Sequence, residues 1–146
     1  MATKKTAAPR HRLLIVDDEE SVRLLLARLL TKGMNVEAQL AGTCEQALRL
    51  ARNYAYDAIL LDLMMPGIGG FEVLKTIRAS SANMATPIMI VSGLEDLHTN
   101  DRCLAAGADG FLVKPVERRA LLYAVKALLA SRGKAKRRPL YVEKDS

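Results

Sequence analysis

Short apolar runs alternate with longer helix-like stretches five times along the chain, and this alternation limits the fold more than any other feature. The strong runs are Leu13–Val16, Asp57–Leu61, Ile88–Val91 and Gly110–Val113, and a weaker one is Val36–Leu40. Such continuous apolar strands are typical of a parallel sheet that is covered on both faces. We therefore predict an α/β fold: a doubly wound, five-stranded parallel sheet in the flavodoxin-like order 2-1-3-4-5, with five helices and right-handed crossovers.

The apolar periodicity also predicts which helix faces are buried. The residues expected to face inward from the first helix are Val22, Leu25, Leu26 and Leu29. Those expected from the last helix, about Val116 to Ser131, are Leu121, Leu122, Val125, Leu128 and Leu129. The second helix should begin at a capping box formed by Thr43 and Gln46. The third helix should begin near Phe71, and the fourth should cover Glu95–Ala106.

Length and composition fit one domain with short extensions. The chain has 146 residues, of which 50% are hydrophobic and 4% aromatic, so its core must be mostly aliphatic. It has no apolar run that could span a bilayer, and Met1–Arg12 lacks the apolar centre of a signal peptide. Its two cysteines, Cys44 and Cys103, lack the spacing of a zinc site or a disulfide framework. These features predict a cytoplasmic protein with reduced thiols.

The positive charge lies at both ends of the chain. Of the formal net charge of +6, Met1–Arg12 contributes +4 and Ser131–Ser146 another +4, which leaves −2 for the body. A mildly acidic body gives no reason to expect direct nucleic-acid binding. We predict a basic flexible tail at residues 1–11, the folded domain at residues 12–130, and a basic extension or linker at residues 131–146.

Polar side chains stand directly after the four strong strands. Asp17 and Asp18 follow the first, Asp62 follows the next, and Ser92 and Lys114 follow the last two. The carboxyl ends of parallel strands share one edge, and in this strand order a crevice opens between the first and third strands. Each residue alone could cap a helix, belong to a turn or face solvent. Their common position predicts a single site.

Three neighbouring carboxylates repel one another unless a cation is bound. Mg²⁺ suits such a site because it prefers oxygen ligands from one or two carboxylates, water and phosphate. Aspartate can accept a phosphoryl group, and a metal, a lysine and a hydroxyl would neutralise the charge on the group being transferred. The residues therefore indicate phosphoryl transfer onto an aspartate.

Four motifs at characteristic spacings narrow the interpretation: LLIVDDEE, DAILLDLMMPGIGGFEVL, PIMIVSG and GADGFLVKP. Through them, the stretch from Arg12 to Ala130 resembles the receiver domain of two-component response regulators, the CheY-like family. The resemblance implies a phosphoprotein of phosphorelay signal transduction and not an enzyme, apart from promoting its own phosphorylation and dephosphorylation. It implies a histidine kinase or histidine phosphotransfer protein as the phosphoryl donor.

The resemblance also assigns the metal site. Asp62 is implied to be the phosphoacceptor and one of the groups around Mg²⁺. Asp18 matches the direct metal ligand and Asp17 its water-mediated partner, while the backbone carbonyl of Met64 completes the protein's share of the shell.

The remaining implied roles concern the phosphoryl group and the switch. Ser92 is expected to hydrogen-bond the phosphoryl group and Lys114 to pair with it. Phe111 occupies the aromatic switch position and is expected to swing inward when Ser92 moves. A cis bond is common before the proline that corresponds to Pro115.

Four positions depart from the family pattern. Gly69 stands where Asp or Asn is usual, so the cap of the third helix should be weaker. Gly93 replaces a common alanine and is expected to loosen its loop. Phe111 lacks a hydroxyl, so a switch there must act through packing. Met64 offers no polar side chain to position an attacking water, which leaves the lifetime of the phosphoryl group open.

Two alternatives to phosphorylation-driven signalling stay open at this point. One is a pseudo-receiver that only docks, although that class loses site residues. The other is an aspartyl phosphatase of the haloacid-dehalogenase type, which needs an acid where this chain has Met64. A homodimer through the last two helices and the last strand is a further expectation, as is a downstream output domain. The candidate partner surface consists of His98, Arg102, Arg118, Arg119, Tyr123 and Lys126.

Overall fold

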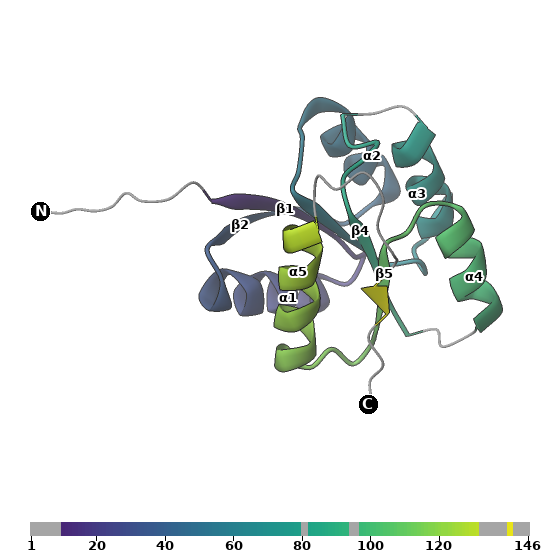
Figure 1. The fold of residues 1–146 in the computed structure, drawn as a ribbon. Coiled ribbons are helices and arrows are strands. Elements are labelled where there is room, and N and C mark those ends of the chain that lie inside the picture. Colours follow the sequence, from purple (N-terminus) through teal and green to yellow (C-terminus); the bar gives the residue numbers. More distant parts are fainter. Residues whose placement is uncertain (1–9, 80–81, 94–96, 132–139, 142–146) are drawn as a thin grey trace, which may run out of the picture.

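A computed structural model describes residues 10–79, 82–93, 97–131 and 140–141 of the chain, which form a parallel sheet with helices on both faces (Figure 1). The strands are β1 (His11–Val16), β2 (Val36–Ala41), β3 (Ala58–Leu61), β4 (Ile88–Ser92), β5 (Gly110–Val113) and β6 (Leu140–Tyr141). The helices are α1 (Glu20–Gly33), α2 (Cys44–Asn53), α3 (Gly69–Ala79), α4 (Leu97–Ala105) and α5 (Arg118–Ser131). The predicted alternation of strands and helices is confirmed.

The strand order is β2-β1-β3-β4-β5-β6, and every pair is parallel. The first five strands have the predicted order 2-1-3-4-5. Strand β1 pairs with β2 on one side and with β3 on the other, so the chain changes direction across the sheet at β1. The carboxyl ends of β1 and β3 are therefore neighbours, and the register places Val16 opposite Leu61.

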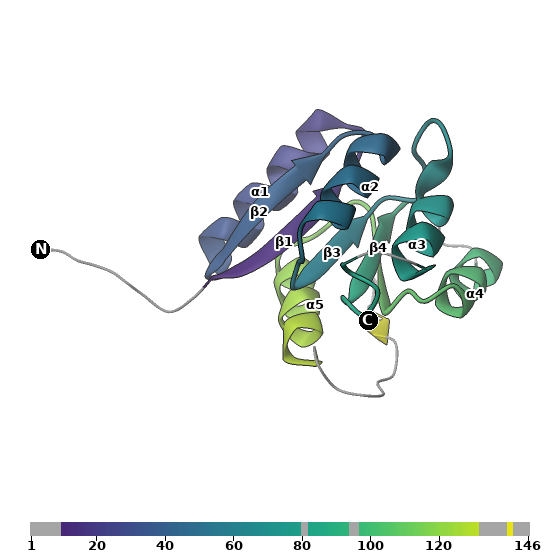
Figure 2. The same ribbon diagram turned by 90° about the horizontal axis from the view of Figure 1, so that it is seen from above.

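Alternate residues of each strand enter two separate hydrophobic cores. Leu14 and Val16 belong to the core shared with α2, α3 and part of α4, whereas Leu13 and Ile15 belong to the core shared with α1 and α5. Figure 2 shows α1 and α5 on one side of the sheet and α2 and α3 on the other. This two-sided burial explains why the strands are continuous apolar runs rather than alternating ones.

The predicted capping of α2 is confirmed. The Thr43 side chain accepts a hydrogen bond from the backbone N–H of Gln46 at 3.0 Å. The Gln46 side chain accepts in turn from the backbone N–H of Gly42 at 2.9 Å, one residue before the N-cap, so the reciprocal half of the box is displaced. Both cysteines are buried and free, in agreement with their prediction as unpaired thiols.

The predicted inward face of α1 is partly wrong. Leu25 is 48% exposed, and Leu30, which was not predicted, is fully buried beside Leu26. Leucines occupy so much of this helix that the pattern fits more than one face. Contacts with β1, β2 and α5 select the face. On α5 the prediction is closer: Leu121, Val125 and Leu128 are buried, Leu122 and Leu129 are partly buried, and Ala124 joins them.

The sheet continues beyond the five predicted strands. β6 pairs with β5, with Gly110 opposite Leu140 and Phe111 opposite Tyr141. This strand lies within residues 131–146, which the sequence suggested only as an extension or linker. Of the predicted extension, Ser131 is the last residue of α5, and residues 132–139 and 142–146 lie outside the described residues. Of the predicted N-terminal tail, residues 1–9 lie outside the described residues, and His11 is the first residue of β1. No helix in the described part of the chain is long and apolar enough to cross a membrane.

Candidate functional site

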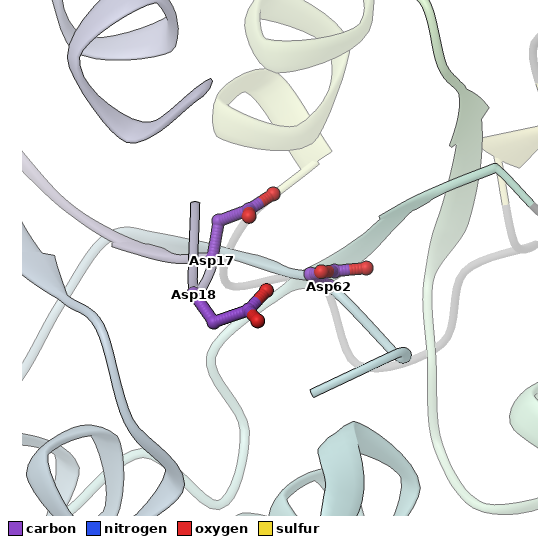
Figure 3. Close-up of side chains that lie close together, drawn as sticks. All are labelled: Asp17, Asp18 and Asp62. Atoms are coloured by element: carbon purple, nitrogen blue, oxygen red, sulfur yellow. The ribbon is translucent and has the colours of Figure 1, made fainter. Parts of the chain in front are cut away.

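Three carboxylates meet where β1 and β3 end (Figure 3). Asp17 and Asp18 follow β1 and Asp62 follows β3, and each offers an oxygen within 4.8 Å of the other two. Asp17 and Asp62 are buried, with 1% and 4% of their surfaces exposed, whereas Asp18 is exposed. These three side chains therefore converge at one place, as the sequence predicted.

Backbone hydrogen bonds hold the two buried carboxylates at the sheet edge. The N–H of Asp17 donates to Ala41 on β2 at 3.1 Å, and the N–H of Asp62 donates to Val16 on β1 at 2.9 Å. Each side chain then accepts from the N–H two residues ahead: Asp17 from Glu19 at 2.9 Å and Asp62 from Met64 at 3.2 Å. These bonds turn the chain away from the sheet and fix the direction of the carboxylates.

Lys114 brings one positive charge to the carboxylates. Its Nζ lies 2.7 Å from Oδ2 of Asp17 and 3.6 Å from Oδ2 of Asp62. The backbone N–H of Lys114 donates to the Ser92 carbonyl at 2.9 Å, which ties the ends of β5 and β4 together. The bond between Lys114 and Pro115 is cis, as the resemblance suggested. Lys114 therefore lies beside Asp17 and Asp62, as the sequence predicted.

Burial and charge act against each other at these groups. Burial raises the pKa of Asp62 from its usual 3.8 to about 6; the Lys114 charge opposes this rise, and the neighbouring Asp17 carboxylate adds to it. Burial lowers the pKa of Lys114, but the hydrogen bond that its ammonium donates to Asp17 and the charges of Asp62, Asp17 and Glu19 outweigh this effect, so the net direction is upward. Lys114 thus stays positive while Asp62 resists ionisation.

The raised pKa of Asp62 predicts that the stability of the metal-free protein depends on pH. Because the folded pKa of Asp62 exceeds the unfolded value, its contribution to stability is fully present below about pH 3.8 and is lost as the pH rises through about 6. Thermal unfolding in EDTA, measured from pH 4 to 7, should therefore show a smaller fall for Asp62→Asn than for the unmodified chain. If the melting temperatures of the two proteins fell by the same amount between pH 4 and pH 7, the raised pKa of Asp62 would be contradicted.

The turn after Asp62 depends on close backbone contact with α3. A Cβ atom on Gly70 would lie 2.2 Å from the Asp62 carbonyl oxygen and 2.6 Å from Cα of Leu63. The N–H of Gly70 donates to the Leu63 carbonyl at 3.0 Å. Gly69 has a φ of +87°, which glycine adopts without strain, and this gives a local reason for glycine at the position where the family usually has Asp or Asn.

The carboxylates open into a cleft of about 370 Å³. Its lining residues are Asp18, Glu19, Asp62, Met64, Gly93 and Lys114. The Met64 side chain is 64% exposed, so it forms part of the rim. Glu19 and Gly93 were not predicted to line the site. The run of four acids after β1 was the available signal for Glu19, and its position next to Ser92 was the signal for Gly93.

Ser92 and Phe111 share a second, smaller cavity. This cavity measures about 10 Å³ and also involves Leu63 and Asn100, and both Ser92 and Phe111 are buried. Ser92 therefore lies at the end of β4 as predicted, but it is Gly93 beside it that lines the main cleft. Both predicted switch residues therefore line one small cavity, and Phe111, which was expected to swing inward, is already buried in this structure.

The donor set fits a small divalent cation. Three carboxylates against one ammonium group leave the site with an excess of negative charge when all are ionised. Oxygen ligands and an open cleft with room for water match the preferences of Mg²⁺. A bound cation would also favour the ionised form of Asp62, whose burial otherwise opposes it.

Comparison with known proteins gives the same assignment as the site geometry. A sequence profile of the response regulator receiver domain matches residues 13–126. The chain is 36% identical over 117 residues to the cell cycle transcriptional regulator CtrA of Caulobacter vibrioides, covering 80% of this chain and 49% of that protein. This chain thus spans about half the length of the curated relatives it matches.

Solved receiver structures have the same fold. The CheY-like receiver domain protein of Methanospirillum hungatei aligns with a TM-score of 0.80 at 27% identity, over 88% of this chain and all of that one. CheY4 of Vibrio cholerae, a chemotaxis response regulator, aligns with a TM-score of 0.78 at 30% identity, over 83% of this chain and all of that one. Given the matched profile, the fold and the acidic cleft, the chain belongs to the family of response regulator receiver domains of two-component signalling.

Proposed function

We propose that this receiver domain accepts a phosphoryl group on Asp62, with Mg²⁺ bound beside it, from a histidine kinase or a histidine phosphotransfer protein. The main support for this proposal is the set of groups around Asp62. Its buried carboxylate faces a cleft, has Asp17 and Asp18 within 4.8 Å, and has the Lys114 ammonium 3.6 Å away.

The proposed transfer is a single displacement at phosphorus. A carboxylate oxygen of Asp62 forms a bond to the phosphorus while the bond to the donor's imidazole nitrogen breaks, and the electron pair stays on that nitrogen. The imidazole takes up a proton from solvent. Lys114 neutralises phosphoryl oxygens as they enter the cleft, which requires its Nζ to turn from Asp17 toward the incoming group. The hydroxyl of Ser92 is proposed to hydrogen-bond the same group.

Asp18 and Asp17 are proposed to hold the metal, together with Asp62 and the backbone carbonyl of Met64. Mg²⁺ supplies positive charge to the phosphoryl oxygens when it is bound. Asp18 is the exposed member of the three acids and faces the cleft, so its oxygens can reach a hydrated ion at little desolvation cost. Asp17, buried and paired with Lys114, is better placed to hold a metal-bound water.

Replacing Asp18 with alanine should weaken Mg²⁺ binding by more than roughly tenfold, because even outer-shell changes at metal sites cost that much. Isothermal titration calorimetry of Mg²⁺ measures this directly. Glu20→Ala is the matched control, since Glu20 is an exposed acid in the first turn of α1 that does not line the cleft. Equal Mg²⁺ affinity in Asp18→Ala and the unmodified chain would exclude Asp18 as a ligand.

The proposed response to phosphorylation is a packing change around Phe111. Phe111 is 4% exposed and shares its small cavity with Ser92, so a move of the Ser92 hydroxyl toward the phosphoryl group would open space for the ring. Phosphorylation adds about two negative charges, which supplies the driving force.

A Phe111→Ala variant should still bind the phosphoryl mimic beryllofluoride but show a blunted conformational response. Amide chemical-shift changes in β4 and β5 should fall to roughly half or less, since the shifting ring is gone. Phe71→Ala is the matched control, because Phe71 is the other phenylalanine of the chain and lies on α3, with the Arg102 guanidinium over its ring. If Phe111→Ala instead failed to bind beryllofluoride, Phe111 would belong to the binding site rather than to the switch.

The proposal extends to partners and domain limits. The folded receiver is proposed to cover residues 12–130, with an output domain or separate partner as the recipient of the signal. Among the residues named as a partner surface, Tyr123 is 63% exposed on α5, and the guanidinium of Arg102 stacks on Phe71 at 4.4 Å from the ring centre. The side chain of His98 lies outside the described residues.

A further inference from the structure

A guanidinium group connects α1 to the backbone that carries the acidic pair. Nη1 of Arg23, in the first turn of α1, donates a hydrogen bond to the Asp17 carbonyl oxygen at 2.8 Å. This carbonyl belongs to the peptide group that joins Asp17 to Asp18, and a peptide group is planar and moves as one unit. Arg23 is not among the described residues that line the cleft, so its contact with the site is through the backbone.

The turn between β2 and α2 completes the support of this backbone. The N–H of Asp17 donates to the Ala41 carbonyl at 3.1 Å, at the end of β2. The Arg23 guanidinium, which bonds to the carbonyl of Asp17, lies beside Gly42, the next residue of the turn. The Gly42 N–H is itself bonded to the Gln46 side chain at 2.9 Å. Both backbone polar groups of Asp17 are therefore held, one directly by the turn and one by an arginine that lies against it.

Glycine at position 42 leaves the room that this guanidinium needs. A Cβ atom on Gly42 would lie 2.7 Å from Nη1 and 3.1 Å from Cζ of Arg23. The first distance is too short for atoms that are not bonded, but the obstacle is the far end of a flexible side chain and not backbone. A methyl group at this position would therefore be accommodated by moving the guanidinium, which would break its bond to the Asp17 carbonyl.

The Asp18 carboxylate depends on this peptide more than the Asp17 carboxylate does. The Asp17 side chain is held by two further contacts, with the Glu19 N–H at 2.9 Å and with the Lys114 ammonium at 2.7 Å. Asp18 is exposed and lines the cleft, so its place follows mainly from the backbone that carries it. Groups that hold metal ligands in place typically change the metal affinity when they are lost.

We propose that Arg23 is a positioning residue of the metal site, which holds the peptide between Asp17 and Asp18 so that the Asp18 carboxylate faces the cation. Gly42 has a part in this role because it leaves space for the guanidinium. The inference rests on the proposed function, in which Asp18 is a ligand of Mg²⁺. The positive charge of Arg23 by itself opposes a cation, so a loss of Mg²⁺ affinity on its removal must come from lost positioning.

The main test is Gly42→Ala, which keeps the Arg23 charge but displaces the guanidinium. Isothermal titration calorimetry should show Mg²⁺ binding roughly tenfold weaker than in the unmodified chain, the lower end of the effect of such supporting groups. Arg23→Met should also weaken binding. The double variant should bind no more weakly than Arg23→Met, because the methyl group then has no guanidinium to displace. Arg28→Met, a change of an exposed arginine on the same helix, is the control and should leave the affinity unchanged.

Two results of this titration would overturn the proposal. One is an unchanged Mg²⁺ affinity in Gly42→Ala. The other is an equal loss of affinity when Gly42→Ala is added to Arg23→Met, because Gly42 would then act independently of the guanidinium. Thermal unfolding of each variant checks that it is folded, so that weaker binding is not a consequence of lost structure.

The second measurement needs no metal. The amide nitrogen of Asp18 belongs to the same peptide group as the Asp17 carbonyl, so its resonance should shift in metal-free Gly42→Ala and Arg23→Met but not in Arg28→Met. A shifted resonance with unchanged Mg²⁺ affinity would overturn the positioning role. If the unmodified chain bound no Mg²⁺, the proposed metal site would be refuted and this role with it, whereas the Asp18 resonance would still decide whether Arg23 holds the peptide.

Discussion

An Asp62→Asn variant is expected to take up no label from acetyl phosphate, whereas the unmodified chain is labelled in the presence of Mg²⁺. The amide cannot act as the nucleophile. Asp17 is as buried as Asp62 and lies closer to Lys114, but it does not line the cleft, and of the acids that do only Asp62 is buried. Phosphate-affinity electrophoresis and intact mass spectrometry both measure the incorporation. We expect no detectable phosphoryl label on the Asp62→Asn variant.

The control is Asp57→Asn, an identical change at the opposite end of the same strand. Asp57 accepts a hydrogen bond from the Arg12 N–H at 2.7 Å and lies far from the carboxyl ends of the strands, so labelling should persist. Label retained by Asp62→Asn on another residue would refute the assignment of Asp62.

The same Asp62→Asn substitution should raise stability, which separates loss of function from loss of fold. A carboxyl whose pKa is raised to about 6 costs free energy when it is ionised at neutral pH. Removing this charge should stabilise the metal-free protein by up to about 3 kcal/mol at pH 7, from roughly two units of pKa shift. Thermal unfolding in EDTA measures the gain, and a lower melting temperature would contradict the electrostatic interpretation.

A Gly70→Ala variant should lose both stability and phosphorylation, the second large effect expected. The added methyl group would meet the Asp62 carbonyl oxygen at 2.2 Å and Cα of Leu63 at 2.6 Å, and neither is the end of a flexible side chain. Either α3 or the turn that carries Asp62 must move. Overpacking of this kind costs about 1–3 kcal/mol, and displacing the acceptor carboxylate by about 1 Å can slow a reaction by roughly a hundredfold.

Gly93→Ala is the matched control for Gly70→Ala. Gly93 also lines the cleft, but a Cβ atom there would have no heavy atom within 4 Å. The same added methyl group should therefore leave stability unchanged within about 0.5 kcal/mol and leave acetyl phosphate labelling in place. Urea unfolding and the labelling rate measure the two effects. Equal losses in both variants would show that any bulk in the cleft, rather than the Gly70 contact, is responsible.

Much of the candidate site could be predicted from residue order alone. Asp17, Asp62 and Lys114 each follow an apolar strand, and parallel strands bring their carboxyl ends to one edge. No distance was needed for that prediction. Ser92 lies at the end of β4, as expected, but residue order did not predict that it lines the smaller cavity together with Phe111.

What the sequence determined by itself was the alternation of strands and helices, the parallel sheet and the set of polar residues at its edge, because strand burial and turn chemistry are local properties. The tertiary structure alone decided that α1 buries Leu30 and exposes Leu25, that Lys114 pairs more closely with Asp17 than with Asp62, and that β6 extends the sheet. These features depend on contacts between segments far apart in the chain, where several local patterns are equally satisfied and packing chooses among them.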